Sequence, residues 1–191
     1  SIKGVIRYWY RALVGPDRLK EEAELFGSSD ENVGASKLKI AISDKSKLTF
    51  YNKSKFDEIG KYVFKHPTKG FRINPLNYLA YGVVDNNRQI IRDALSPGCT
   101  FNIKLSLQCS NNIQINDFYK SLYLMLNFGG LGSRSRKGYG ALKLLNEDDI
   151  FNGQDWFVNG NIAQTLQNII NQKNPVKVLL YEKEYSYLDT D

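Results

Sequence analysis

The chain has 191 residues, of which 42% are hydrophobic and 24% are charged, and its formal net charge is +6 at pH 7. This composition predicts a globular protein with one sizeable core, and the positive charge favours an anionic partner, with nucleic acid as the leading candidate. No run approaches the roughly 18 apolar residues of a membrane span, and no basic-then-apolar leader opens the chain, so we predict a soluble, cytoplasmic protein.

The first fourteen residues predict an amphipathic helix that buries one face and carries charge on an adjoining stripe. The apolar residues at helical spacing are Ile2, Val5, Ile6, Trp9 and Leu13. The charged stripe consists of Lys3, Arg7 and Arg11. Successive charges on it lie roughly 6 Å apart along the axis, which could follow neighbouring phosphates of an extended strand. The alternative is an ordinary amphipathic helix, because Arg and Lys stems often only cover apolar surface.

The residues after this helix predict a second, shorter helix and a strand. Gly15 and Pro16 break the first helical pattern, and residues 19–26 can form the second helix before a turn at 27–30. Alternating apolar residues then predict a strand over residues 36–42.

Residues 43–77 show no sustained apolar period, and they include seven lysines. Such a stretch is long for a structureless loop, so we predict an insertion that forms a small subelement of its own or becomes ordered on a partner. Further along, the pattern predicts a strand over 76–84, a short helix over 89–95 that ends before Pro97, and a strand over 100–108.

Cys99 and Cys109 flank the last of these strands. If residues 100–108 form one strand, the two cysteines lie about 33 Å apart, well beyond the reach of a disulfide bond, so both thiols should be reduced. With two cysteines and one histidine in the chain, a structural zinc site is not expected. We predict no metal and no cofactor.

A helix predicted over residues 115–128 leads into the glycine loop, residues 128–140, which holds five glycines and three cations. Glycine lets main-chain N–H groups approach an anionic surface, while arginine and lysine supply charge for phosphate oxygens. We predict that the loop grips a nucleic-acid backbone and that it converges with the charged stripe on one cationic groove. The predicted binding residues of the loop are Gly129, Gly130, Gly132, Ser133, Arg134, Ser135, Arg136, Lys137 and Gly138. The alternative is a mobile surface turn whose charges are only solvated.

Two phosphate-binding motifs do not fit the glycine loop. The P-loop requires Ser or Thr after its lysine, but Lys137 is followed by Gly138. The dinucleotide fingerprint requires a third glycine where the chain has Ser135. The loop also follows a helix and precedes a predicted strand over 139–145, which reverses the strand-to-helix order of both motifs.

Beyond the loop, we predict a helix over 162–170 and a short strand over 176–181. The element order matches an α+β domain of the ferredoxin-like or RRM-like kind over residues 1–145, with an insertion near 43–77, followed by a C-terminal extension or the start of a second domain at 146–191. The first strand of that fold, which lies in the middle of the sheet, has no counterpart here. We therefore expect the chain to be a fragment or a cleavage product, or another polypeptide to supply the strand.

Several of these segments resemble the RAMP superfamily of type III CRISPR effector complexes, and most of all the first RAMP subunit of the Cmr (type III-B) complexes. Residues 1–13 are similar to the first helix of that subunit, and residues 24–28 resemble the turn that follows it. The later segments that resemble family landmarks, in the same order, are residues 78–82, residues 92–95 with Pro97 and Gly98, and residues 128–142. The resemblance covers roughly residues 1–145.

The resemblance implies an RRM-like domain that binds RNA within a multisubunit complex of antiviral defence. The partners it implies are guide RNA, target single-stranded RNA and other Cmr subunits, without a membrane. It implies binding rather than cutting, because in such complexes a different, repeated subunit cleaves the target. Family members usually have a first strand upstream and a second RAMP-like domain downstream, and the sequence departs from the family in both respects.

Two other functions stay open. Some RAMP proteins are metal-independent endoribonucleases that process guide precursors, and His66 is the only histidine that could move a proton in that reaction. Asp148 and Asp149 could recruit Mg²⁺, but no further acidic residue has the spacing of a two-metal site. Ser133 and Ser135 have no identifiable base, so we predict no catalytic residue. The other alternative is a structural adaptor whose basic surfaces bind acidic protein partners.

Overall fold

The structure is a computed structural model that describes residues 1–30, 32–51, 64–65, 67–70, 72–73, 78–83, 85 and 91–171. The chain divides into two compact units, residues 1–145 and residues 146–191. Each unit has its own buried side chains and is described by itself. No helix in the described part of the chain is long and apolar enough to cross a membrane.

The helices of the first unit are α1 (Ile2–Val14), the 3₁₀ turn η1 (Pro16–Arg18), α2 (Leu19–Phe26) and α4 (Asn112–Phe128). Side chains cap the two long helices, since the Ser1 hydroxyl accepts from the Gly4 amide and the Asn111 side chain accepts from the amides of Ile113 and Gln114. Gly15 ends α1 with a φ of 84°, a conformation that favours glycine. The helices predicted over 1–14, 19–26 and 115–128 are confirmed.

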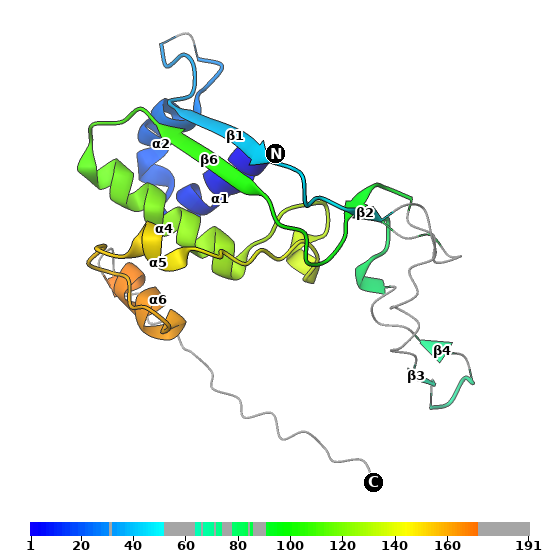
Figure 1. Ribbon diagram of the computed structural model, residues 1–191. Coiled ribbons are helices and arrows are strands. Elements are labelled where there is room, and N and C mark those ends of the chain that lie inside the picture. Colours follow the sequence, from blue (N-terminus) through cyan, green and yellow to red (C-terminus); the bar gives the residue numbers. More distant parts are fainter. Residues whose placement is uncertain are drawn as a thin grey trace. The chain divides into compact units, whose positions relative to one another are not determined.

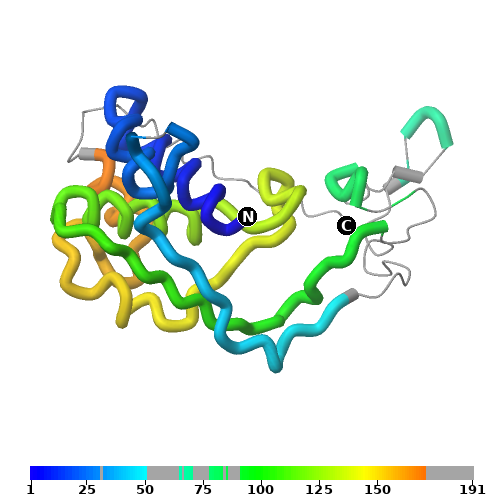
Figure 2. Tube along the Cα trace, turned by 90° about the horizontal axis from the view of Figure 1, so that it is seen from above, coloured from blue at the N-terminus to red at the C-terminus, as the bar shows by residue number. Residues whose placement is uncertain are grey.

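The sheet of the first unit is an antiparallel pair, β1 (Leu38–Asp44) and β6 (Asn102–Leu107), in which Ile40 lies opposite Leu105. The helices lie on one side of this pair, and α1 packs on α4 (Figures 1 and 2). The buried apolar side chains of the unit are Ile6, Tyr10, Leu25, Phe26, Leu38, Ala80, Phe118, Leu122, Tyr123, Leu124 and Met125. The strands predicted over 36–42 and 100–108 are confirmed, and the fold is of the α+β class.

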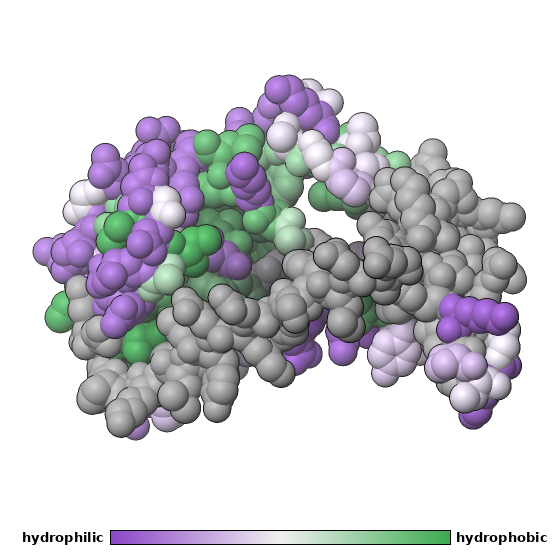
Figure 3. All heavy atoms as spheres, turned by 90° about the horizontal axis from the view of Figure 1, so that it is seen from below, coloured by the Kyte–Doolittle hydropathy of each residue, from purple (hydrophilic) through white to green (hydrophobic). Residues whose placement is uncertain are grey.

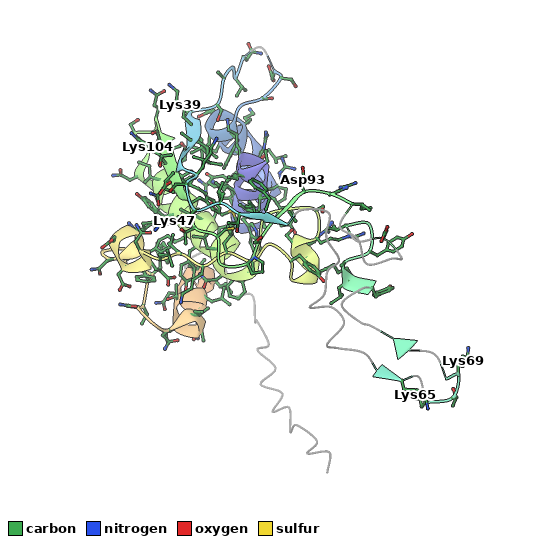
Figure 4. All side chains as sticks on the ribbon, turned by 45° about the vertical axis from the view of Figure 1, so that its right-hand side comes forward. Lys39, Lys47, Lys65, Lys69, Asp93 and Lys104 are labelled. Carbon is green, nitrogen blue, oxygen red and sulfur yellow. The ribbon has the colours of Figure 1, made fainter. Side chains whose placement is uncertain are left out.

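The whole segment between β1 and β6, called the insertion from here on, is longer than the insertion predicted near 43–77, and it contains short antiparallel pairs. One joins β2 (Phe50–Tyr51) to β5 (Ala94–Leu95), and the other joins β3 (Phe64–Lys65) to β4 (Arg72–Ile73). Whether the segment predicted over 43–77 is a subelement of its own or becomes ordered on a partner stays a prediction. The end of the β3–β4 pair is hydrophilic, and Lys65 and Lys69 lie on it (Figures 3 and 4).

Two predicted elements in the insertion are wrong where the structure describes them. Tyr78 and Leu79 are helical, and a turn with a single bridge residue at Tyr81 follows them, so residues 78–83 form no continuous strand. The amides of Tyr81 and Val83 donate to carbonyls three residues earlier, and Gly82 has a φ of 84°. Ala94 and Leu95 form β5 rather than the end of a helix, because they pair with β2 as antiparallel strands. The remaining residues of both predicted elements lie outside the described part.

The strand predicted over 139–145 is also absent. A segment becomes a strand only when a neighbouring segment exchanges backbone hydrogen bonds with it, and no described residues form such a ladder beside 139–145. The apolar residues of this segment were therefore insufficient to specify a strand. Cys99 and Cys109 are free thiols, which confirms the prediction that no disulfide joins them.

The second unit contains α5 (Glu147–Phe151) and α6 (Ile162–Asn171). The rings of Phe151 and Trp156 are fully buried and pack on each other with centroids 5.8 Å apart. Thr165 is buried as well, and its hydroxyl contacts the backbone of Val158. The helix predicted over 162–170 is confirmed, whereas the strand predicted over 176–181 lies outside the described residues.

Candidate nucleic-acid interface

The glycine loop is closed at its base by a backbone hydrogen bond. The amide of Leu131 donates to the carbonyl of Gly140 over 2.9 Å. Gly140 has a φ of 72°, and a Cβ atom at this position would lie 1.8 Å from the Leu131 carbonyl oxygen. A Cβ atom on Gly130 would lie 2.9 Å from the Gly140 carbonyl oxygen. These glycines are therefore required by the close approach of the two ends of the loop.

The tip of the loop has a different geometry, because its glycines face open space. Residues Ser135–Lys137 form the 3₁₀ turn η3, in which the Lys137 amide donates to the Arg134 carbonyl over 2.8 Å. Gly132 and Gly138 have positive φ angles, and no atom would lie within 4 Å of a Cβ atom on either. Arg136 and Lys137 are exposed, and their side chains form no ion pair within the described part of the chain. The loop is thus closed at its base, and its tip presents backbone groups and two cations to solvent.

Arg134 has a more specific role than the other cations of the loop. Its guanidinium donates to the backbone carbonyl of Tyr81, which lies in the turn at residues 78–83. Gly82 permits this approach, because a Cβ atom there would lie 2.8 Å from the Nη2 atom of Arg134. Arg134 therefore joins the insertion to the glycine loop. No local pattern could predict this contact, since the two residues are 53 positions apart in the chain.

The charged stripe on α1 is bound to α2. Arg7 and Arg11 both donate to the carboxylate of Glu22, over distances of 2.5–2.6 Å, and Arg7 also donates to the Gly27 carbonyl over 3.1 Å. The Glu22 side chain is only 1% exposed, whereas those of Arg7 and Arg11 are 35% and 54% exposed. The hydrogen bond from Arg11, together with that from Arg7, lowers the pKa of Glu22 despite its burial. The two arginines thus stabilise the packing of α1 against α2.

The structure brings the start of α1 to the glycine loop but does not turn the arginines toward it. A Cβ atom on Gly129 would lie 2.7 Å from the Nε1 atom of Trp9, and the N-terminal end of α1 lies beside the loop in both views (Figures 1 and 2). Arg7 and Arg11 are each roughly 200° from Trp9 around the helix, since each residue turns the helix by about 100°. Lys3 is half-buried on the first turn. The role of this stripe in RNA binding stays a prediction.

The outer face of the sheet carries a second group of basic residues. Lys39 and Lys104 are exposed and lie on β1 and β6, where Ala41 is paired with Lys104 and Lys39 with Ser106 (Figure 4). RNA-binding sheets of the RRM kind stack bases on aromatic side chains of this face. The alternating positions of β1 and β6 that face outward carry no aromatic residue. This face is therefore basic but not a stacking platform.

The residues considered for catalysis come from separate segments of the chain. His66 lies outside the described residues. Asp148 and Asp149 belong to the first turn of α5 in the second unit, where negative charge is favourable at a helix start. Within the described ranges, no group of three or more His, Cys, Asp or Glu side chains could hold a metal ion.

Stability should depend on pH through Glu22. Because its pKa is lowered in the folded protein, the ionised carboxylate stabilises the fold fully above its ordinary pKa of 4.5, and this contribution is lost as the pH falls through the folded pKa. We expect the stability difference between the wild type and Glu22→Gln to shrink below pH 4.5, as measured by urea unfolding across a pH series. Glu24→Gln is the control, since Glu24 is 50% exposed. A difference that is constant with pH would contradict this role of Glu22.

Comparison with protein families finds a match to the model of the RAMP superfamily over residues 1–143. Two curated relatives come from Pyrococcus furiosus. The CRISPR system Cmr subunit Cmr1-1 is 31% identical over 153 residues, which cover 76% of this chain and 39% of that protein. The CRISPR system Cmr subunit Cmr1-2 is 25% identical over 160 residues, which cover 75% of this chain and 80% of that protein.

Comparison with solved structures finds the same fold. The crystal structure of Cmr1 from Pyrococcus furiosus in its apo form matches with a TM-score of 0.58 and 22% sequence identity. The match covers 91% of this chain and 50% of that one. The chain thus spans about half of the solved relative and 39% of the first curated one.

Proposed function

Because the chain belongs to the RAMP superfamily, we propose that it is an RNA-binding subunit of a type III (Cmr-type) CRISPR ribonucleoprotein complex. Its relatives are named as Cmr subunits, which supports membership of such a complex. In this proposal, the chain contacts guide RNA and target RNA beside other Cmr subunits, and it binds RNA rather than cleaving it. The observation that carries the proposal is the glycine loop, which is closed at its base and presents Arg136 and Lys137 at its tip, with no ion-pair partner among the described residues.

The loop suits the backbone of RNA better than any particular base. Its cations can form charge-assisted hydrogen bonds with phosphate oxygens, and the exposed backbone around Gly132 and Gly138 allows a strand to approach closely. Contacts of this kind position a strand without reading its sequence. Binding should therefore tolerate changes in sequence and weaken as the salt concentration rises.

A salt titration tests this function. Replacing Arg136 and Lys137 by alanine should remove two phosphate contacts and lower the slope of log affinity against log salt by about 1.4, at about 0.7 for each contact with a single strand. Between about 50 and 200 mM salt, the wild type should therefore lose about sevenfold more affinity than the variant. The measurement is fluorescence anisotropy with a labelled single-stranded RNA of mixed sequence.

The matched control is Lys20→Ala/Lys45→Ala, which removes the same charge from α2 and from the loop after β1, where both lysines are exposed. The control should keep most of the wild-type slope. Equal slopes for the wild type and the Arg136/Lys137 variant would reject the glycine loop as the contact. The RNA should also be recovered intact in EDTA, and discrete cleavage products would instead support an endoribonuclease.

A further inference from the structure

A pocket lies where the glycine loop meets the insertion. It has a volume of about 370 Å³ and is lined, among the described residues, by Tyr78, Tyr81, Arg134 and Lys137. The tyrosines and the cations come from segments that are distant in the sequence. The contact between Arg134 and the Tyr81 carbonyl brings them together.

The tyrosines of this pocket are unusually accessible. The side chain of Tyr78 is 79% exposed and that of Tyr81 is 70% exposed, whereas Tyr10 and Tyr123 are buried in the core of the same unit. Tyr78 and Tyr81 are three residues apart on one tight turn, in which the Tyr81 amide donates to the Tyr78 carbonyl over 3.3 Å. Their aromatic surface is therefore not used to stabilise the described core.

Two contacts fix the turn that carries these tyrosines. Ala80, which lies between them, is 1% exposed and anchors the turn by burial. On the other side, the guanidinium of Arg134 binds the Tyr81 carbonyl over Gly82, which leaves no space for a larger residue. The backbone that carries the rings is thus fixed beside the exposed Lys137 before any ligand binds, which reduces the ordering that binding would require.

This combination of groups matches the chemistry of a nucleotide. Exposed aromatic rings stack on nucleobases, and a neighbouring lysine attracts the phosphate. The volume lies at the lower end of the range for small-ligand sites, which suits one flat ring system. The outer face of the β1–β6 pair offers lysines but no aromatic surface, so the pocket is the better place for a base.

We propose that this pocket receives one unstacked nucleobase of the RNA strand whose backbone is bound at the tip of the glycine loop. Tyr78 and Tyr81 supply the stacking surface, Lys137 contacts the adjoining phosphate, and Arg134 is a positioning residue that fixes the turn. The inference rests on the proposed RNA-binding function and adds a base-binding subsite to it.

The test compares an ordinary single-stranded RNA with an abasic RNA of the same length, which has the same phosphates but no bases. The full wild-type chain should bind the ordinary RNA about five- to 150-fold more tightly, as expected for the stacking of one base. Tyr78→Leu/Tyr81→Leu should lose this preference while its salt slope stays at the wild-type value. Tyr78→Phe/Tyr81→Phe should keep the preference, because the rings remain.

Tyr8→Leu is the matched control, since Tyr8 is an exposed tyrosine on α1 with 64% exposure, and it should leave the preference unchanged. If the Tyr78→Leu/Tyr81→Leu variant keeps the wild-type preference for ordinary RNA, the pocket does not bind a base. In that case, a lowered salt slope in Arg136→Ala/Lys137→Ala would still support the proposed RNA-binding function. Absence of RNA binding by the wild type would overturn both. Displacement of the RNA by AMP or UMP at concentrations matching the RNA affinity would identify a site for free nucleotides and would also overturn the proposal.

Discussion

Gly140→Ala is expected to open the glycine loop and to weaken RNA binding with it. The added Cβ atom would lie 1.8 Å from the Leu131 carbonyl oxygen, so the hydrogen bond between Leu131 and residue 140 cannot persist. Strain from the φ of 72° adds about 1–3 kcal/mol for a residue other than glycine. Because the loop can open without unfolding the helices, we expect the largest change in local stability rather than in the melting temperature.

Hydrogen exchange of the Leu131 amide measures this opening directly. In the wild type this amide should be protected, and in Gly140→Ala it should exchange at the rate of an exposed amide. Gly138→Ala is a matched control, because Gly138 also has a positive φ but a Cβ atom there meets nothing within 4 Å. In the control, the positive φ adds backbone strain without a steric clash, so the Leu131 amide should stay protected. Equal protection of Leu131 in both variants would show that closure of the loop does not depend on Gly140.

Replacing both Arg7 and Arg11 by methionine is expected to destabilise the first unit strongly. Methionine retains an apolar stem but leaves the carboxylate of Glu22, which is 1% exposed, without its two partners. Loss of the partners of a buried charge typically costs about 3–5 kcal/mol. Chemical denaturation followed by circular dichroism measures this loss. The triple variant Arg7→Met/Arg11→Met/Glu22→Met should recover most of the stability, since it removes the stranded charge as well.

The same variants separate the structural role of the stripe from a role in binding. Lys3→Met is the control, because Lys3 is not among the cations that pair with Glu22 in the described part of the chain and should change stability little. If the triple variant is stable and binds RNA with the wild-type salt slope, then Arg7 and Arg11 serve the fold alone. A lowered slope would instead show that the stripe also contacts phosphates. A stable Arg7→Met/Arg11→Met protein would contradict the structural role.

The helices and strands that could be predicted from the sequence are those that a local pattern of apolar residues specifies. Helices α1, α2, α4 and α6 follow from apolar residues at helical spacing, and strands β1 and β6 follow from large apolar residues at every second position. Their types were therefore recoverable from short windows of sequence. The resemblance to the RAMP superfamily is confirmed by the family match over residues 1–143.

The wrong predictions fall where distant residues decide the structure. Ala94 and Leu95 are extended because they pair with Phe50 and Tyr51, far away in the chain. Residues 78–83 form a turn that Gly82 permits and that Arg134 binds from another segment. In each case a tertiary contact outweighs a local preference that was weak.

The candidate site also has a part that can be recognised in the sequence and a part that depends on tertiary contacts. The glycines and cations of residues 128–140 can be recognised in the sequence, because loops that bind anions require these residue types. The pairing of Arg7 and Arg11 with Glu22 could be suspected from an acidic residue on the next helix, but not established. The pocket at Tyr78 and Tyr81 could not be predicted, because their environment depends on where the turn docks.

The pairing of β2 with β5 has a consequence for how this protein can vary. It closes the base of the insertion, so the chain leaves and rejoins the β1–β6 hairpin at neighbouring points. Closing a longer flexible loop costs only about 0.6 kcal/mol for each doubling of its length. Changes of length between β2 and β5 should therefore cost little stability, provided that Ala80 stays buried and the Tyr81 carbonyl still meets the guanidinium of Arg134.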